Sequence, residues 1–111
     1  MQFMIFVIDD GLASAGEEEM DAIGAFNDSL KAAGQFVMAE GIHSGDNAHV
    51  IDNRGGSGLV TPGSLYSEPE RYTGFWIIDA DDEAQALEIA QGASRACSRK
   101  VELRAYLTPK V

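Results

Sequence analysis

The sequence predicts an α+β fold of order βαββαβ, with two helices on one face of an antiparallel sheet. Two observations lead to this prediction. Apolar, strand-like runs alternate with two amphipathic, helix-like segments. The two halves also echo each other, because in each an apolar run ends at an aspartate, Asp9 or Asp79, and an acidic helix start follows. We therefore expect the ferredoxin-like arrangement, in a single domain over residues 1–111.

The two central strands are expected to be apolar on both sides. Residues 2–8 (QFMIFVI) and 74–80 (GFWIIDA) carry apolar side chains on both alternating faces. Such continuous runs are typical of strands that have no side facing solvent. Further strands are predicted over residues 35–42, 48–53 and 99–107, and the segment 59–61 continues a strand.

Two helices are predicted, over residues 17–33 and 82–96. In the first, apolar side chains recur every three or four residues and form one stripe, made of Met20, Ile23, Phe26, Leu30 and Ala33. The stripe of the second helix consists of Ala86, Leu87, Ala90 and Ala93. We expect Gly34 to end the first helix and Asp81 to cap the start of the second.

The predicted sheet has two apolar faces, but two helices cover only one of them. Packing of the second face against the same face of another copy is the simplest way to bury it. This predicts a symmetric homodimer, to which Trp76 or Phe75 contributes. The alternative is that residues 54–73 of the same chain fold over that face.

Composition excludes several classes of partner. The chain has 18 acidic and 8 basic residues, a formal net charge of -10. Nucleic acids and anionic membrane surfaces bind clustered Lys and Arg, so we expect neither as a partner. The apolar N-terminal run lacks a basic n-region and is predicted to be a strand, not a signal peptide. No run reaches the roughly 18 apolar residues of a membrane span, and we expect a soluble, cytoplasmic protein.

The single cysteine, Cys97, rules out an internal disulfide and any zinc site that needs two or more cysteines. Its neighbours Arg95 and Arg99 could lower the pKa of the thiol, but a small, partly buried apolar role fits its helical position better. The segment RGGSG lacks the Lys-Ser/Thr ending of a phosphate-binding loop, and no dinucleotide-binding fingerprint is present. No cofactor or metal is expected.

The polar side of the last strand is one candidate site. If its other side packs under the helices, this side points into the covered cleft and carries Glu102, Arg104 and Tyr106. Residues two apart on a strand face lie about 7 Å from each other, so Glu102 and Arg104 could pair. A partly buried carboxylate beside an arginine can act as a base or bind an anion. The alternative is that these residues meet solvent or hold the dimer together.

The segment HSGDNAH is a second candidate site and contains both histidines of the chain. A hairpin could bring His43 and His49 together, and Asp46 could orient one of them as a general base. Two histidines and a carboxylate can also bind zinc, but this spacing is not a recognised ligand pattern. A polar hairpin without chemistry is the alternative.

Several ordered motifs resemble the YCII-related family, in its DGPF subgroup. Members of that family carry a segment like VTDGPFAE, a charged spacer, a Gly-Gly-aromatic step, Asp-Glu-Ala at a helix start and a final VEVRP. Here LVTPGSLYSEPERYTGFWIID matches the first part without a gap from Val60 to Phe75, and DDEAQALEIA and VELRAYL match the later parts. The matching positions are Val60, Thr61, Gly63, Gly74, Phe75, Glu102 and Arg104. The chain departs from the motif at Pro62, where the family has Asp, and at Ile51, Ser64 and Leu65.

The resemblance implies a dimer of the dimeric α+β barrel type. We further expect residues 66–72 to form a loop over the mouth of the dimer cleft, where Tyr66, Glu68 and Tyr72 could contact a ligand. The alternative for each of them is an exposed loop without a ligand. Some relatives resemble small-molecule isomerases, lyases or dehydrochlorinases with a proposed His-Asp dyad, and others are linked to transcription regulation.

Two functions therefore stay open. The first is a small dimeric protein that binds a small molecule or has an accessory role. The second is an enzyme acting on a small aromatic or lactone-like substrate, with His43 or Glu102 as general base and Arg104 as anion-binding group. The absence of the family's Asp at position 62 favours the first.

Overall fold

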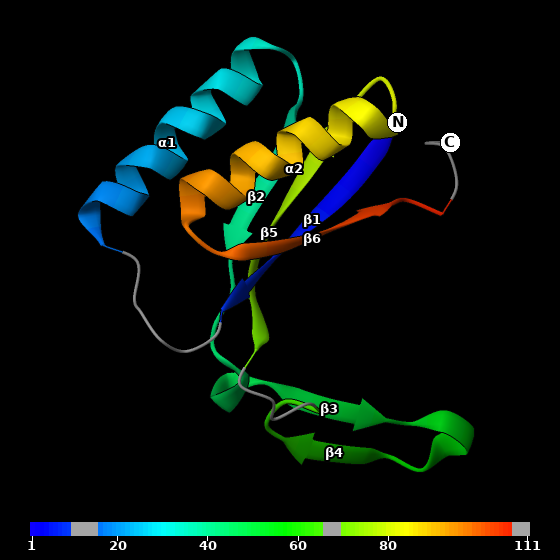
Figure 1. The fold of residues 1–111 in the computed structure, drawn as a ribbon. Helices are drawn as coiled ribbons and strands as arrows, with labels where there is room; N and C mark the ends of the chain where they lie inside the picture. The colour runs from blue at the N-terminus through cyan, green and yellow to red at the C-terminus, as the bar shows by residue number, and fades with distance from the viewer. Residues whose placement is uncertain (10–15, 66–69, 108–111) are drawn as a thin grey trace.

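The computed structural model of the chain describes residues 1–9, 16–65 and 70–107 (Figure 1). The elements are β1 (Gln2–Asp9), α1 (Glu17–Ala32), β2 (Phe36–Gly41), β3 (His49–Asp52), β4 (Leu59–Pro62), β5 (Arg71–Asp79), α2 (Glu83–Cys97) and β6 (Lys100–Ala105), with short 3-10 turns at Gly45–Asn47 and Arg54–Gly56. Four strands form an antiparallel sheet in the order β2-β5-β1-β6, and β3 pairs with β4 in a separate two-stranded sheet. The predicted ferredoxin-like fold is confirmed, with a β3–β4 hairpin added between β2 and β5.

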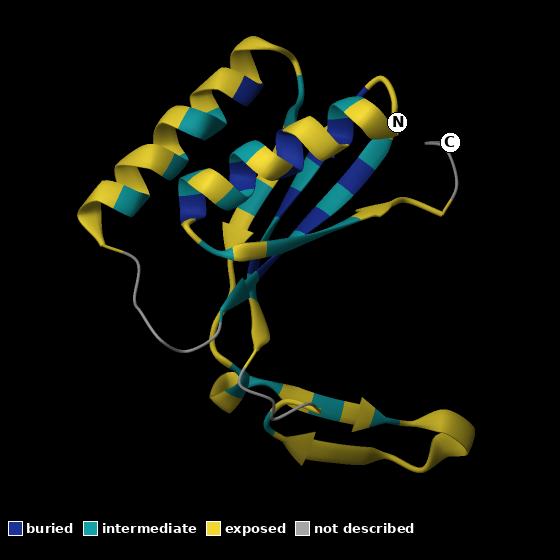
Figure 2. Cartoon of the chain, in the orientation of Figure 1, coloured by how far each residue is buried: buried dark blue, intermediate teal, exposed yellow. Residues whose placement is uncertain are grey.

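The core lies between the sheet and the two helices. On β1 the buried side chains alternate with half-buried ones, and Phe3, Ile5 and Val7 face the helices. The antiparallel register places Ile5 opposite Trp76 of β5, so the helix-facing residues of the two central strands form one layer. The other face of both strands is apolar, as predicted, but within one chain its side chains are only half-buried. Figure 2 shows the buried residues gathered between the sheet and α2.

Trp76 belongs to the helix-facing layer and not to a dimer face. Its ring meets the ring of Phe26 edge-on, with centroids 5.6 Å apart, and its Nε1 donates a hydrogen bond of 2.6 Å to Oδ1 of Asn27. A buried tryptophan needs such a partner for its N–H. The prediction that Trp76 contributes to a dimer interface is therefore wrong, and its neighbour Phe75 faces the opposite side of the sheet because side chains alternate along a strand.

The apolar stripes of both helices differ from those that the sequence suggested. Leu30 is buried and Ile23 and Phe26 pack against the core, but Met20 is 57% exposed and Ala33 is exposed. The reason is that α1 packs mainly against α2 and less against the sheet. On α2 the stripe runs through Ala86, Ile89, Ala90, Ala93 and Cys97, whereas Leu87 lies outside it and is half-exposed.

The helix ends follow the predicted chemistry with one correction. Gly34 has φ +71°, and the amides of Gly34 and Gln35 donate to the carbonyls of Lys31 and Leu30, as in a Schellman C-cap. The N-cap of α2 is Asp82, not Asp81, because the helix begins one residue later than predicted. Its carboxylate accepts a hydrogen bond of 2.8 Å from the amide of Gln85.

The chain is thin and exposes more surface than its mass implies. Its extents are 46 × 38 × 18 Å and its radius of gyration is 15.8 Å, against about 13 Å for a compact domain of this length. Its accessible surface is 7828 Å², against about 5,900 Å² for a folded chain of 11.9 kDa. Within the part of the chain that the structure describes, neither helix is long and apolar enough to cross a membrane.

Two helix glycines test the packing of α1 on α2. A Cβ at Gly24 would meet nothing within 4 Å, whereas a Cβ at Gly92 would lie 2.9 Å from Cε1 of Phe26. We expect Gly24→Ala to raise the free energy of unfolding by about 0.5–1 kcal/mol through helix propensity. The free energy of unfolding of Gly92→Ala should lie about 1–3 kcal/mol below that of Gly24→Ala, because the added methyl group pushes Phe26 against Trp76.

Urea unfolding of both variants measures this difference, and Gly24→Ala is the control for propensity. Equal stabilisation by the two substitutions would contradict the described contact between α2 and Phe26.

Candidate ligand-binding site

The face of the four-stranded sheet that the helices leave uncovered, the open face, combines apolar and charged side chains. The register places Phe6 of β1 opposite Phe75 of β5 and Glu102 of β6, and it places Met4 opposite Ile77 and Arg104. By the same alternation, the open face consists of Met4, Phe6, Ile8, Met38, Glu40, Tyr72, Phe75, Ile77, Glu102 and Arg104. The predicted split of the last strand is confirmed at its centre, since Val101 and Leu103 pack on the core side.

Four of these side chains form a connected cluster. Nε of Arg104 donates a hydrogen bond of 2.6 Å to Oε2 of Glu102, which confirms the pairing expected from their spacing. The guanidinium of Arg104 lies 5.6 Å from the centre of the Phe6 ring, and the rings of Phe6 and Tyr72 are 4.7 Å apart. The Tyr72 hydroxyl is 3.5 Å from Oε1 of Glu102, which is long for such a hydrogen bond.

The electrostatics of this cluster keep the arginine charged. The hydrogen bond to Glu102 is the largest cause that raises the pKa of the Arg104 guanidinium, and the charge of Glu102 adds to it. The side chains of Arg104 and Glu102 are 64% and 37% exposed. Exposed ion pairs add little to stability because water screens them. The pair is therefore better suited to contacting a ligand or a partner than to holding the fold.

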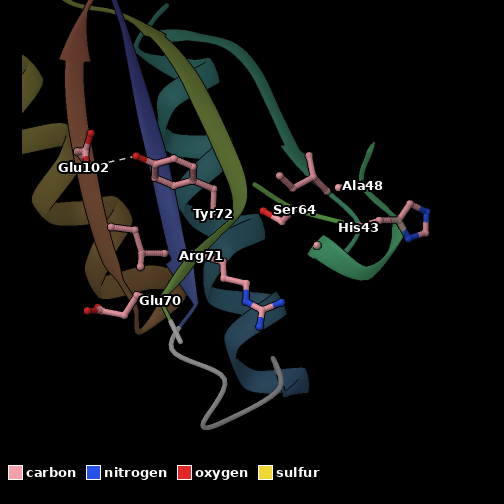
Figure 3. A pocket seen from close by; sticks show the side chains of 10 residues that line it. His43, Ala48, Ser64, Glu70, Arg71, Tyr72 and Glu102 are labelled. Carbon is pink, nitrogen blue, oxygen red and sulfur yellow. Dashed lines mark hydrogen bonds between the residues drawn. The ribbon is translucent and has the colours of Figure 1, made fainter. Parts of the chain in front are cut away.

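A pocket of about 500 Å³ lies at one end of the open face (Figure 3). One wall comes from the open face and consists of Ile8, Tyr72 and Glu102. The other comes from the segments that lead into and out of the β3–β4 hairpin and consists of Ile42, His43, Gly45, Ala48 and Ser64. Glu70 and Arg71 line the pocket at the start of β5. The pocket thus occupies the inner corner between the sheet and the hairpin.

Backbone contacts and two glycines build this corner. The amide of Ile42 donates to the carbonyl of Thr73 at 3.0 Å, and the amide of Gly63 donates to the carbonyl of Ala48 at 2.6 Å. Gly63 has φ +96°, a region that favours glycine. At Gly74 a Cβ would lie 3.0 Å from the carbonyl oxygen of Glu40, so a side chain would push β2 away. Both glycines therefore serve backbone geometry.

Comparison with known families agrees with the motifs in the sequence. The family model described as the YCII-related domain matches residues 1–107. The chain belongs to the YCII-related family. No curated protein matches the chain.

The YCII-related motif can now be placed on the structure. Pro62, which stands where the family motif has Asp, ends β4 opposite His49 and does not line the pocket. Ser64, which replaces the motif's Pro, does line it. The residue at position 62 is therefore not part of the described pocket lining.

The residues of the HSGDNAH segment are spread out in this YCII-related protein. His43 lines the pocket, but Figure 3 shows its imidazole ring turned away from Tyr72 and Glu102. Asp46 lies in the 3-10 turn and His49 in β3, and neither lines the pocket. Among the described residues no hydrogen bond joins these three side chains, and no group of three or more His, Cys, Asp or Glu could hold a metal ion. A His-Asp dyad stays a prediction.

The remaining predicted ligand contacts differ in their position relative to the pocket. Tyr72 lines the pocket, whereas Tyr106 lies just beyond β6, where its amide donates to the carbonyl of Gln2. Arg104 does not line the pocket, but it contacts Glu102, which does. Tyr66 and Glu68 lie outside the described residues.

Sequence reasoning missed several side chains that shape the site, among them Phe6, Ile8, Ile42, Ser64 and Arg71. Phe6 and Ile8 carried a usable signal, since they share the apolar side of residues 2–8 that the helices cannot cover. The others carried none, because they come together only through the corner between the hairpin and the sheet.

A second charged cluster lies at the far end of α2, around Arg99. Nη1 of Arg99 donates to Oε1 of Glu19 at 2.6 Å and to the carbonyl of Cys97 at 3.1 Å, and Nε lies 3.8 Å from Asp9. Burial is the largest influence on the Cys97 thiol and raises its pKa, more than Arg99 lowers it. Cys97 is 2% exposed, so the predicted apolar role is confirmed and an activated thiol is not formed.

Burial of the Cys97 thiol predicts slow alkylation in the folded protein. Iodoacetamide should alkylate Cys97 far more slowly in the native state than in urea at the same mildly alkaline pH. The pKa is raised in the folded state, so the contribution of the neutral thiol to the free energy of unfolding is present below its ordinary value of 9.0 and is lost as the pH rises past it. Mass spectrometry of timed samples measures the alkylation rate, and equal rates in both states would overturn the buried placement.

Proposed function

We propose that this YCII-related protein binds a small molecule in the corner pocket, as a homodimer whose open faces pack against each other. The observation that carries the proposal is the convergence of two separate chain segments on one pocket, with an aromatic ring and a carboxylate at its wall. Its volume of about 500 Å³ falls within the range of small-molecule sites in proteins.

The lining indicates the type of ligand. Ile8, Ile42 and the ring of Tyr72 offer an apolar wall against which a planar ring can pack. Glu102 offers a carboxylate oxygen toward Tyr72, while its second oxygen is held by Arg104. A small ring compound with a hydroxyl or amine that donates to Glu102 fits this arrangement.

The apolar open face supports the homodimer. Met4, Phe6, Phe75 and Ile77 form a half-buried apolar centre between charged residues at the edge, which resembles the core and rim of protein interfaces. A second copy on this face would cover that centre and reduce the solvent exposure of the pocket.

A matched pair of tyrosines tests the site. Tyr72→Ala should lower the affinity for small ring compounds by at least about tenfold, because it removes the aromatic wall. Tyr106→Ala is the control, since Tyr106 lies at the other end of the sheet and outside the pocket. Saturation-transfer NMR with a library of small aromatic and lactone compounds measures binding, and an equal loss in both variants would contradict the placement of the site.

An isomerase- or lyase-type enzyme is the second candidate. The observation in its favour is that both predicted general bases, His43 and Glu102, line the same pocket. A base must come within about 3 Å of the proton it removes, and a bound ligand could bring either group into reach. Membership of the DGPF subgroup and a link to transcription regulation stay predictions.

The two candidates differ in what two substitutions do. If the protein is an enzyme, His43→Ala or Glu102→Gln should lower kcat by about 100-fold or more, the usual contribution of a general base, with a smaller effect on ligand affinity. Turnover of compounds found in the NMR screen is the measurement, and Glu88→Gln on the outer side of α2 is the control. Full turnover in both variants would remove these residues as bases.

A further inference from the structure

The β3–β4 hairpin, residues 49–62, is called the arm. Figure 1 shows it set apart from the four-stranded sheet, and Figure 2 shows that nearly all of it is exposed. Its strands pair with each other and pack little against the rest of the chain. An isolated two-stranded hairpin is marginally stable in water, so a cover for the arm would stabilise it.

The arm presents apolar side chains to solvent. Ile51 and Val60 are directly opposite each other in the register and are 68% and 60% exposed. Leu59, on the other side of the hairpin, is 59% exposed. Paired β-branched residues on one side of a hairpin form a flat apolar surface that is suited to packing.

The tip of the arm is held in one shape by its own hydrogen bonds. Arg54 donates to both carboxylate oxygens of Asp52, at 3.0 and 2.7 Å. The Ser57 hydroxyl donates to the carbonyl of Asp52, and the amide of Gly58 donates to Oδ1 of Asn53 at 2.8 Å. A preformed arm loses less conformational entropy on binding a partner than a flexible loop would.

Charge indicates what kind of surface the arm can approach. The chain has a formal net charge of -10, yet between positions 47 and 65 its only charged residues are Asp52 and Arg54, which pair with each other. The arm is therefore neutral in a strongly acidic chain, and it can approach a second copy without the repulsion that the acidic helices would meet.

The amount of exposed surface also fits a second copy. The chain exposes about 1,900 Å² more than is typical for its mass. Obligate homodimers bury about 1,000–2,500 Å² per chain. The corner pocket joins the open face to the segments that flank the arm, at Ala48 and Ser64, so a copy seated on the open face lies next to the arm.

We propose that the arm is an interface element that packs, through Ile51 and Val60, against the second copy of this chain seated on the open face. The inference rests on the homodimer of the proposed function and adds a second contact to it. Each corner pocket is then closed from outside by the partner subunit, and the ligand site is complete only in the dimer.

Sedimentation equilibrium of purified protein tests the arm. The double variant Ile51→Thr/Val60→Thr keeps strand-forming residues but removes the apolar surface, and Leu87→Gln on α2 is the control for loss of an exposed leucine. The dissociation constant of the arm-variant dimer should be at least about tenfold higher than that of the wild type, since the substitutions remove two aliphatic side chains that the dimer would bury. Its urea midpoint, measured at a concentration where both proteins are monomers, should be unchanged because these side chains are exposed within one chain.

A photo-crosslinking amino acid at position 51 provides the second measurement. In mixtures of isotopically light and heavy protein, crosslinks should join light to heavy chains. Two results would overturn the arm inference while the proposed homodimer stands. In one, the wild type is a dimer and the variant dimer has the same dissociation constant. In the other, the wild type is a dimer but crosslinks form only within one chain. If the wild type is a monomer throughout, both fail.

Discussion

The structure depends on one constraint, which is that two helices cover only one face of a four-stranded sheet. Phe3, Ile5, Trp76 and Ile78 are buried on the covered face. Their neighbours along the same strands carry side chains of similar apolar character on the other face, which no helix among the described residues covers. The thin shape, the large accessible surface and the position of the pocket all follow from this imbalance.

The hairpin inserted between β2 and β5 gives the uncovered face a pocket at one end. A flat sheet face offers no concavity, but the arm leaves the sheet at an angle and its root supplies a second wall. Gly63 and Gly74 permit that departure, one through its left-handed backbone and the other through close approach to β2. The Glu102–Arg104 pair and the Tyr72 ring then lie beside the corner.

The sequence was informative where local patterns decide the structure. Alternation along residues 99–107 was enough to predict that Glu102 and Arg104 share a face and pair. Helical spacing identified Leu30, Ala90 and Ala93 as core residues. It could not show that α1 packs mainly against α2, an arrangement that leaves Met20 exposed to solvent. The sequence left open whether Trp76 or Phe75 faces away from the helices, because both sides of their strand are apolar, and only the packing of Trp76 against Phe26 of α1 decides it. The pocket residues Ser64 and Arg71 carried no signal, since the corner that unites them is a tertiary feature.

The central claim is that a second copy covers the open face. Small-angle X-ray scattering of the wild-type protein tests it directly, because mass and shape come from the same sample. We expect a mass near twice the 11.9 kDa of one chain and a radius of gyration above the single-chain value of 15.8 Å, over a range of micromolar concentrations. A mass of one chain at every concentration would contradict the account.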